Sequence, residues 1–179
     1  AASLALAENQ PVQDVDYNLL KTRLLADGQV LGYGTPSVAK EQPGMVDDEQ
    51  ATRFGFPNRS HSTPGFLGQG YRHSGLLTGE ETEAQTIIWN AALDKAGKYD
   101  VLITWPPHAN RATNVSLEVT HADGTKRIDN IDQTKMPGRV GFHKLGYFSL
   151  APGKASVKLT TSGCQGYVVA DTVWFRKAK

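Results

Sequence analysis

Residues 166–176 form an apolar run that contains a single carboxylate, Asp171. Side chains alternate between the two faces of a β-strand, so one continuous strand would place Asp171 on the same face as Val169 and Val173. That face should be turned to a hydrophobic core, where a carboxylate is costly unless it is paired or hydrogen-bonded. Asp171 therefore either belongs to a functional site or stabilises the fold through a partner elsewhere in the chain.

The loop 105–112, with the sequence WPPHANRA, contains the best candidate for that partner. A rigid Pro-Pro pair precedes Arg111, whose guanidinium can form bidentate, charge-assisted hydrogen bonds with a carboxylate. We expect Arg111 to turn inward and to form a structural ion pair with Asp171. If Asp171 is buried without a cationic partner, this hypothesis fails and a catalytic role for Asp171 gains support.

Four other residues are our candidates for a ligand-binding surface. His108 and Asn110 lie on the same loop, and loops held by a rigid sheet often carry binding groups. Tyr71 and Trp105 could stack against sugar rings, because the C–H face of a sugar is apolar and an aromatic ring is flat. The alternative is that the aromatic rings belong to the core, since the sequence shows no regularly spaced stripe of aromatics.

No pattern in the sequence indicates a catalytic centre, and we assign no catalytic residue and no metal ligand. A Gly-x-Ser-x-Gly turn and a His-Glu-x-x-His helix are both absent, and the five histidines are scattered. Asp47, Asp48 and Glu49 form an acidic cluster with two open interpretations, a calcium site or a solvated turn. The single cysteine, Cys164, excludes an internal disulfide and a cysteine-based zinc site.

The elements that position these residues are of two kinds, and the first kind is helical. In residues 1–31, Pro11 separates a helix-favouring start from a second segment, whose leucines recur at helical spacing. Gly28 is a typical helix end. The apolar stripe of this helical pair cannot form a core by itself, so we expect it to pack on another domain. Residues 32–44 are rich in glycine and proline and predict a linker.

From residue 45 onward the hydrophobic pattern has a period of two. Strands are predicted for residues 86–90, 99–105, 115–119, 125–131, 139–150, 155–161 and 167–176. Asp123 and Gly124 predict a tight hairpin turn. Short strands with turn signals between them predict an all-β fold for residues 45–179, an antiparallel two-sheet β-sandwich of jelly-roll type.

The composition of the 179-residue chain excludes several classes of protein. Hydrophobic residues make up 39% and charged residues 21%, which is typical of a globular domain. The net charge is +1 and no basic run occurs, which argues against a nucleic-acid-binding protein. No apolar stretch approaches the roughly 20 residues that a membrane-spanning helix needs.

Several motifs together resemble the golvesin / xanthan lyase C-terminal-like domain. They are YR at 71–72, AGKYDV at 96–101, WP at 105–106, NRA at 110–112, LGYF at 145–148 and YVVAD at 167–171. The resemblance extends from residue 45 to residue 176. It departs from the family pattern at Phe142, where tryptophan is more usual, and at Thr172, where alanine is more usual. The resemblance implies a carbohydrate-binding-like β-sandwich attached to larger, often exported bacterial proteins.

The front of the chain resembles a different family. The sequences AASLALA at 1–7, PVQDVD at 11–16 and LLADGQVL at 24–31 are similar to the final helices of bacterial FAD-dependent oxidoreductases. This resemblance implies that residues 1–31 are the remnant of a preceding flavoprotein-like domain and that the parent protein uses FAD. Because no Gly-x-Gly-x-x-Gly fingerprint follows a predicted strand, we assign no cofactor to this chain apart from the calcium considered above.

These observations predict a non-catalytic, carbohydrate-binding-like module at the C-terminal end of a larger bacterial enzyme. Its expected partners are a polysaccharide and the preceding domain, and the expected location is secreted, periplasmic or at the cell surface. Two alternatives stay open. The module could itself be a polysaccharide lyase, with Tyr71, His108 and Arg111 supplying a base and a neutralising cation, or it could be an interdomain brace without a ligand.

Overall fold

The computed structural model describes residues 42–138 and 141–178. The predicted helical pair at residues 1–31, and the predicted linker at 32–44 except for its last three residues, lie outside the described residues. No helix in the part that is described is long and apolar enough to cross a membrane.

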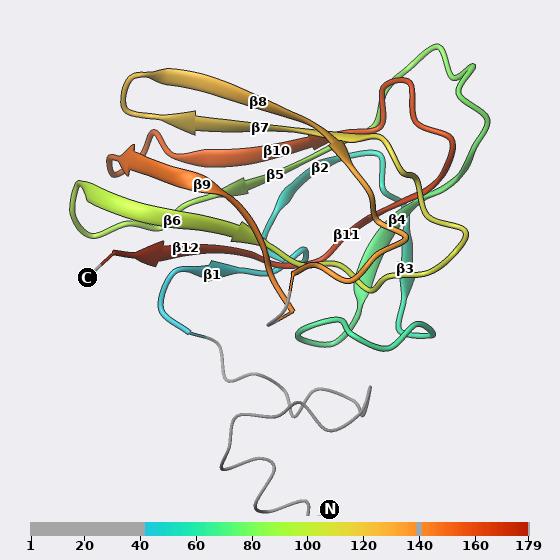
Figure 1. The fold of residues 1–179 in the computed structure, drawn as a ribbon, viewed down its shortest axis with the longest axis horizontal. Coiled ribbons are helices and arrows are strands. Elements are labelled where there is room, and N and C mark those ends of the chain that lie inside the picture. The colour runs from blue at the N-terminus through green and yellow to red at the C-terminus, as the bar shows by residue number, and fades with distance from the viewer. Residues whose placement is uncertain (1–41, 139–140, 179) are drawn as a thin grey trace, which may run out of the picture. The chain divides into compact units, whose positions relative to one another are not determined.

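The described residues form three antiparallel sheets (Figure 1). The four-stranded sheet has the order β1-β12-β6-β9 and consists of Met45–Val46, Val173–Lys177, Gly97–Ile103 and His143–Leu150. The five-stranded sheet has the order β2-β5-β10-β7-β8 and consists of Thr52–Phe54, Thr86–Asn90, Ser156–Thr160, Val115–His121 and Gly124–Ile131. The three-stranded sheet has the order β11-β4-β3 and consists of Gly166–Ala170, Tyr71–Leu77 and Asn58–Ser60.

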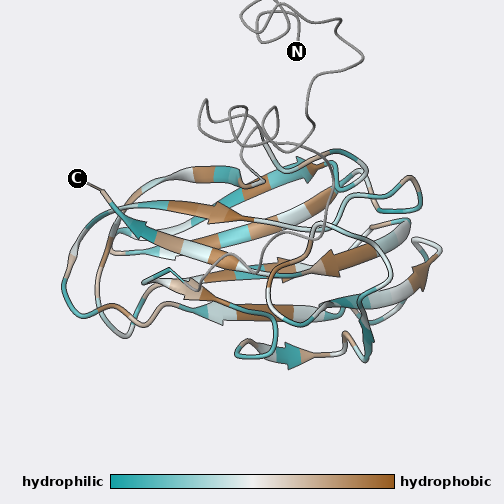
Figure 2. Ribbon diagram, turned by 90° about the horizontal axis from the view of Figure 1, so that it is seen from below, coloured by the Kyte–Doolittle hydropathy of each residue, from teal (hydrophilic) through white to brown (hydrophobic). Residues whose placement is uncertain are grey.

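The two larger sheets form the two layers of a β-sandwich (Figure 1). In β6, Tyr99, Val101 and Ile103 are buried, whereas the alternate residues Lys98 and Asp100 are not. The same alternation appears in most strands as bands of opposite hydropathy (Figure 2). This pattern follows from the period of two in a strand whose one face packs on a core. The prediction of an all-β antiparallel sandwich is confirmed.

The predicted strand at residues 167–176 is in fact two strands in different sheets. β11 pairs with β4, and β12 pairs with β1 and β6. Asp171 and Thr172 lie at the crossing between the sheets and belong to neither strand. Val168 is as completely buried as Val169, so the alternation that placed Asp171 on one face does not extend through this segment. Asp171 is nevertheless buried.

The crossing at Asp171 is fixed by contacts with both layers. The indole Nε1 of Trp89, from β5, donates to the Asp171 carbonyl at 3.0 Å. The Thr104 amide, at the end of β6, donates to the Thr172 carbonyl at 3.0 Å. These bonds satisfy backbone groups that leave the sheets, as buried polar groups require. The loops that carry the predicted site residues converge on this end of the sandwich.

Candidate functional site

Arg111 is the centre of a buried cluster of hydrogen bonds at the loop end of the sandwich. One guanidinium nitrogen, Nη2, donates to the hydroxyls of Tyr71 and Thr63, each at 3.0 Å. The other, Nη1, donates to Asn110 Oδ1 at 3.0 Å. The Arg111 guanidinium also lies 5.4 Å from the centre of the Tyr71 ring, which adds a cation–π contact.

The backbone of the loop is fixed independently of these side chains. The Ala112 amide donates to the Tyr167 carbonyl at 2.9 Å, and the Tyr167 amide donates to the Asn110 carbonyl at 3.0 Å. Gly166 has a φ of +92°, and a Cβ there would approach the Asn110 carbonyl oxygen to 2.9 Å. Glycine is therefore needed at this position for the loop to pack against β11.

The predicted ion pair between Arg111 and Asp171 does not form. No ion pair among the described residues involves either side chain. Asp171 accepts hydrogen bonds from the Leu67 amide at 3.1 Å and from the Thr172 hydroxyl at 3.2 Å. The loop 61–70 contacts both residues, since Thr63 accepts a hydrogen bond from Arg111 and the Leu67 amide donates one to Asp171. The prediction was wrong because neutral groups of Tyr71, Thr63 and Asn110, rather than Asp171, satisfy the guanidinium.

The four predicted ligand-binding residues are only partly brought together. Tyr71 and Asn110 meet at Arg111, and His108 Nδ1 lies 2.8 Å from Asn110 Oδ1. Trp105 points elsewhere and donates from its indole nitrogen to the Lys135 carbonyl at 2.9 Å. His108 and Asn110 are exposed, whereas Tyr71 and Trp105 are each only 2% exposed. Neither of these two rings offers a face on which a sugar can stack.

A second cluster contains carboxylates without a cation at hydrogen-bond distance. Asp47, Asp48 and Asp171 each place a carboxylate oxygen within 4.8 Å of the others. Asp48 and Asp171 are buried, and Asp47 is half-buried. Thr172 Oγ1 lies between two of them, 3.1 Å from Asp47 Oδ2 and 3.2 Å from Asp171 Oδ1. Glu49, the third member of the acidic run, is exposed and pairs with Arg72 at 3.0 Å instead.

The charge of this cluster is poorly compensated. Arg72 Nε lies 3.6 Å from Asp48 Oδ2, which is too long for a hydrogen bond, and both Asp48 oxygens lack hydrogen-bond partners. Burial raises the pKa of Asp48 to about 8, with the neighbouring charge of Asp47 adding to the effect and that of Arg72 opposing it. Burial also raises the pKa of Asp171 well above its usual value. Ionised carboxylates this close together repel one another.

A bound cation would resolve that repulsion. Ca²⁺ prefers carboxylate oxygens and accepts irregular arrangements of six to eight of them, whereas Mg²⁺ demands a near-ideal octahedron. The loop backbone already closes the cluster, because a Cβ at Gly68 would lie 2.7 Å from Asp47 Oδ2. Unpartnered Asp48 oxygens, buried Asp171 and this close backbone together fit a hard cation such as calcium.

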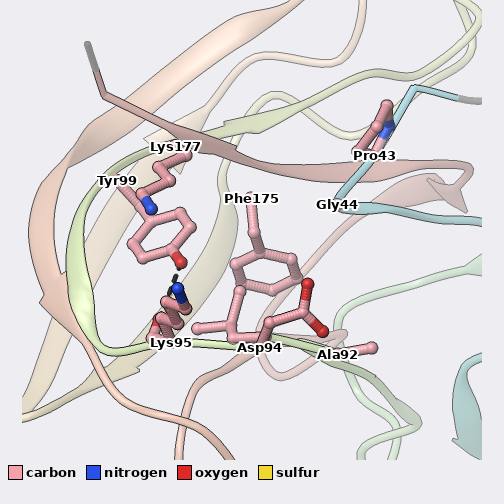
Figure 3. Close-up of a pocket in the computed structure, with 9 residues that line it drawn as sticks. Pro43, Gly44, Ala92, Asp94, Lys95, Tyr99, Phe175 and Lys177 are labelled. Carbon is pink, nitrogen blue, oxygen red and sulfur yellow. Dashed lines mark hydrogen bonds between the residues drawn. The ribbon is translucent and has the colours of Figure 1, made fainter.

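A separate pocket of about 340 Å³ lies away from both clusters (Figure 3). Leu93, Tyr99 and Phe175 contribute its apolar surface, and three charged residues line it as well: Asp94, Lys95 and Lys177. The Tyr99 hydroxyl donates to the Lys95 carbonyl at 2.8 Å, the dashed line in Figure 3. Because both aromatic side chains are almost completely buried, the pocket exposes little ring surface.

Comparison with known proteins places the chain in a family. Residues 45–177 match the model of the Golvesin C-terminal domain. The chain belongs to the Golvesin C-terminal domain family. A xanthan lyase of Bacillus sp. (strain GL1) is 32% identical over 146 residues, which cover 79% of this chain but 15% of that lyase. This golvesin domain therefore corresponds to a small part of its relative.

Solved structures agree with that assignment. The structure of a Paenibacillus xanthan lyase matches 76% of this chain and 13% of its own length, with 28% identity and a TM-score of 0.66. The golvesin domain also shares its fold with a CBM35 module of Paenibacillus barcinonensis, at 16% identity and a TM-score of 0.50 over 75% of this chain and 98% of the module. A Podospora anserina GH26-CBM35 mannanase gives a TM-score of 0.52 at 15% identity, over 77% of this chain and 29% of the enzyme.

Sequence reasoning missed two features of the golvesin domain. It paired Asp171 with Arg111, whereas Asp171 meets Asp47 and Asp48 from the far end of the domain; no local pattern reveals such a long-range contact. It also did not single out Tyr147, which is 55% exposed. A signal for Tyr147 was available, because Phe148 and Leu150 share one face of a strand and Tyr147 must therefore lie on the opposite face.

Proposed function

We propose that this chain is a non-catalytic polysaccharide-binding module of a larger, secreted or surface-exposed bacterial enzyme. The observation that carries the proposal is the fold. A domain with a xanthan lyase relative at 32% identity has the β-sandwich of a module classed among carbohydrate-binding modules. Antiparallel sandwiches offer a rigid outer face and exposed loops on which ligands bind.

The arrangement of candidate catalytic groups supports binding rather than lyase chemistry. A lyase needs a base within hydrogen-bond reach of the proton it removes. Burial by itself raises the pKa of Tyr71, but hydrogen bonds with the hydroxyls of Ser60, Thr63 and Ser62, together with the charge of Arg111, outweigh it and lower the pKa below its usual value. That phenol would be a plausible base, yet it is only 2% exposed and bonded to Arg111. A polymeric substrate has no path to it.

We further propose that Asp47, Asp48 and Asp171 hold a structural calcium ion. The unpartnered Asp48 oxygens and the raised pKa values of Asp48 and Asp171 support this role. Calcium would join β1 to the crossing between β11 and β12, since the ligands come from both ends of the domain. Its expected effect is on stability, because a ligand that binds only the folded state stabilises it by mass action.

Affinity electrophoresis tests the binding function. The full chain is run with millimolar calcium through native gels that contain one polysaccharide each, including xanthan, a mannan and a neutral glucan. The proposal predicts retardation in at least one gel, relative to a protein of similar charge that binds no glycan. Unchanged mobility in every gel would overturn the proposal and leave the structural brace as the better account.

The lyase alternative has its own test. Lyase cleavage of a uronate-containing polymer creates an unsaturated product that absorbs ultraviolet light. We expect no rise in absorbance when the chain is incubated with xanthan, whereas a rise that Tyr71→Phe abolishes would establish catalysis. The parent protein, which we propose to combine this module with a flavoprotein-like or lyase domain, needs a separate assay of the whole protein.

A further inference from the structure

The outer face of the four-stranded sheet carries an aromatic and cationic surface that we call the outer platform. It consists of the charged and aromatic residues whose side chains point away from the core of that sheet: Lys98, Asp100, Lys144, Tyr147, Trp174 and Arg176. Pairing fixes their register: Leu102 lies between Trp174 and Lys144 in one row across the sheet, and Asp100 lies between Arg176 and Tyr147 in another. Figure 1 shows β9 and β12 on either side of β6.

The platform has an excess of positive charge. Asp100 is the single acidic residue in the four strands of this sheet, and two cations of the platform, Lys144 and Arg176, pair with it. Arg176 Nη2 lies 2.9 Å from Asp100 Oδ2, and Lys144 pairs with the other Asp100 oxygen. Hydrogen bonds from Lys144 and Arg176 hold the pKa of Asp100 below its usual value, so it stays ionised. The third cation of the platform, Lys98, donates to Ser149 Oγ at 2.6 Å instead, so the platform holds three cations and one carboxylate.

Two aromatic rings accompany these charges. Tyr147 is 55% exposed, and the Nζ atoms of Lys98 and Lys144 lie 5.9 and 6.0 Å from its ring centre. Trp174 is half-buried, with the Arg176 guanidinium 5.2 Å from its ring. Two strand spacings and an offset of two residues separate the Cα atoms of Tyr147 and Trp174 by about 12 Å. That distance matches a short run of sugar rings rather than one.

The outer face of the five-stranded sheet differs. Its charges are matched one to one, with Lys158 paired to Glu118 at 3.3 Å and Arg127 paired to Asp129 at 2.7 Å. A balanced face has little preference for an anion or a cation. Only the four-stranded sheet therefore combines an exposed aromatic ring with unbalanced positive charge among the described strands.

We propose that the outer platform binds an acidic polysaccharide, with Tyr147 stacking on a sugar ring and Lys98, Lys144 and Arg176 meeting its carboxylates. This inference rests on the proposed function and adds to it the site and the class of glycan. Stacking supplies contact with the apolar face of the ring, and guanidinium and ammonium groups bind carboxylates by charge-assisted hydrogen bonds. Arg176 can turn from Asp100 to the ligand without leaving a buried charge, because both side chains reach solvent.

Isothermal titration of the full chain with xanthan, in millimolar calcium, tests the platform. Carboxyl-reduced xanthan is the matched neutral ligand, since it has the same backbone without the charge. The variants are Tyr147→Ala and the double variant Lys98→Gln/Lys144→Gln. Tyr147→Phe keeps the ring, and Phe54→Ala removes an equally exposed aromatic ring, 64% exposed, from the other large sheet. Thermal unfolding of each variant confirms that it is folded.

We expect Tyr147→Ala to weaken xanthan binding about tenfold, as the loss of one stacked ring should. The double lysine variant should weaken binding and flatten its salt dependence, and reduced xanthan should bind at least about tenfold more weakly than the acidic form. Tyr147→Phe and Phe54→Ala should bind like the unmodified chain.

Other outcomes distinguish a failure of the platform from a failure of the proposed polysaccharide-binding function. If the unmodified chain binds xanthan and the platform variants bind equally well, the platform is wrong and the proposed function stands. Equal binding of the reduced polymer overturns the acidic class, and equal binding of single-stranded DNA overturns the assignment to a glycan. Absence of binding to every polysaccharide overturns both the inference and the function.

Discussion

Charged residues differ in burial between two regions of the molecule. They are buried at the loop end of the sandwich and exposed on the outer platform. At the loop end, Arg111, Asp48 and Asp171 are buried, and the fold fixes the hydrogen-bond partners of Arg111 and Asp171. On the platform, Lys144 and Arg176 are about half exposed and share one carboxylate. Buried charges are costly to disturb, whereas exposed ion pairs contribute little to stability. The loop end should therefore determine stability, and the platform should determine binding.

The loop end itself contains two clusters that differ in completeness. Arg111 has neutral acceptors for its guanidinium within the chain. The carboxylate cluster leaves both Asp48 oxygens without hydrogen bonds. The first cluster is complete without a ligand, whereas the second needs a proton or a cation. Both clusters contact the loop 61–70. The positive charge of Arg111 nevertheless forms no ion pair with the carboxylates of the second cluster.

The largest expected effect is on the carboxylate cluster. Asp171→Ala should destabilise the calcium-loaded chain by about 3–5 kcal/mol, because it leaves the part-buried Leu67 amide unpaired and removes a calcium ligand. Asp171→Asn keeps the shape and should mainly abolish the stabilisation by calcium. Urea denaturation with calcium and with EDTA measures both. Full calcium stabilisation in Asp171→Asn would exclude Asp171 as a ligand.

The stability of the metal-free chain should fall as the pH rises, which is the opposite of the usual effect of a folded protein's aspartates. An unfolded aspartate has its ordinary pKa of 3.8, whereas the folded pKa of Asp48 is about 8. Between these values the folded state holds a proton that the unfolded state has lost, so stability falls as the pH rises, by at most about 1.4 kcal/mol per pH unit for each such proton.

Calcium should remove this loss, because it replaces the proton. Melting temperatures from pH 5 to pH 8, in EDTA and in calcium, should therefore diverge as the pH rises. Burial lowers the pKa of His73 and of His143, which gives a change of the opposite sign, but that change is common to both series and cancels in their difference. Parallel curves would contradict a cation site at Asp48.

Arg111→Lys tests whether the two loop-end clusters are independent. Lysine keeps the charge but loses the fork that reaches Tyr71 and Asn110, so the expected loss is about 2 kcal/mol. Calcium affinity should not change. The double variant Arg111→Lys/Asp171→Asn should lose the sum of the two single effects in free energy of unfolding, within about 0.5 kcal/mol. A deviation from additivity of about 2 kcal/mol or more would instead support the Arg111–Asp171 ion pair that the sequence predicted.

The smallest stability effect should be on the platform. Tyr147→Ala should change the free energy of unfolding by no more than about 0.5 kcal/mol, as exposed substitutions usually do. Its effect on glycan affinity should be much larger. Measuring both the melting temperature and the xanthan affinity of Tyr147→Ala shows whether the substitution affects binding without affecting stability. A melting temperature that falls as far as in Arg111→Lys would mean that Tyr147 is structural.

The sequence predicted much of the fold and little of the site, for different physical reasons. Alternation in β6 and the Asp123–Gly124 turn are local, and the turn is where the hairpin of β7 and β8 forms. The break at Asp171 is not local, because Trp89 and Leu67, distant in sequence, fix it. Likewise, residue type suggested that the Trp105 ring stacks on a sugar, whereas packing against Lys135 and His143 buries that ring.

Tryptophan fluorescence during a xanthan titration tests the central claim most directly. Trp89 and Trp105 are buried, whereas Trp174 lies on the platform beneath Arg176. Movement of that guanidinium to a ligand carboxylate should change the emission of Trp174 alone. We predict a saturable change that is absent in Trp174→Phe and absent with carboxyl-reduced xanthan. Unchanged emission at saturating xanthan, or a change that persists in Trp174→Phe, would contradict acidic glycan binding at the outer platform.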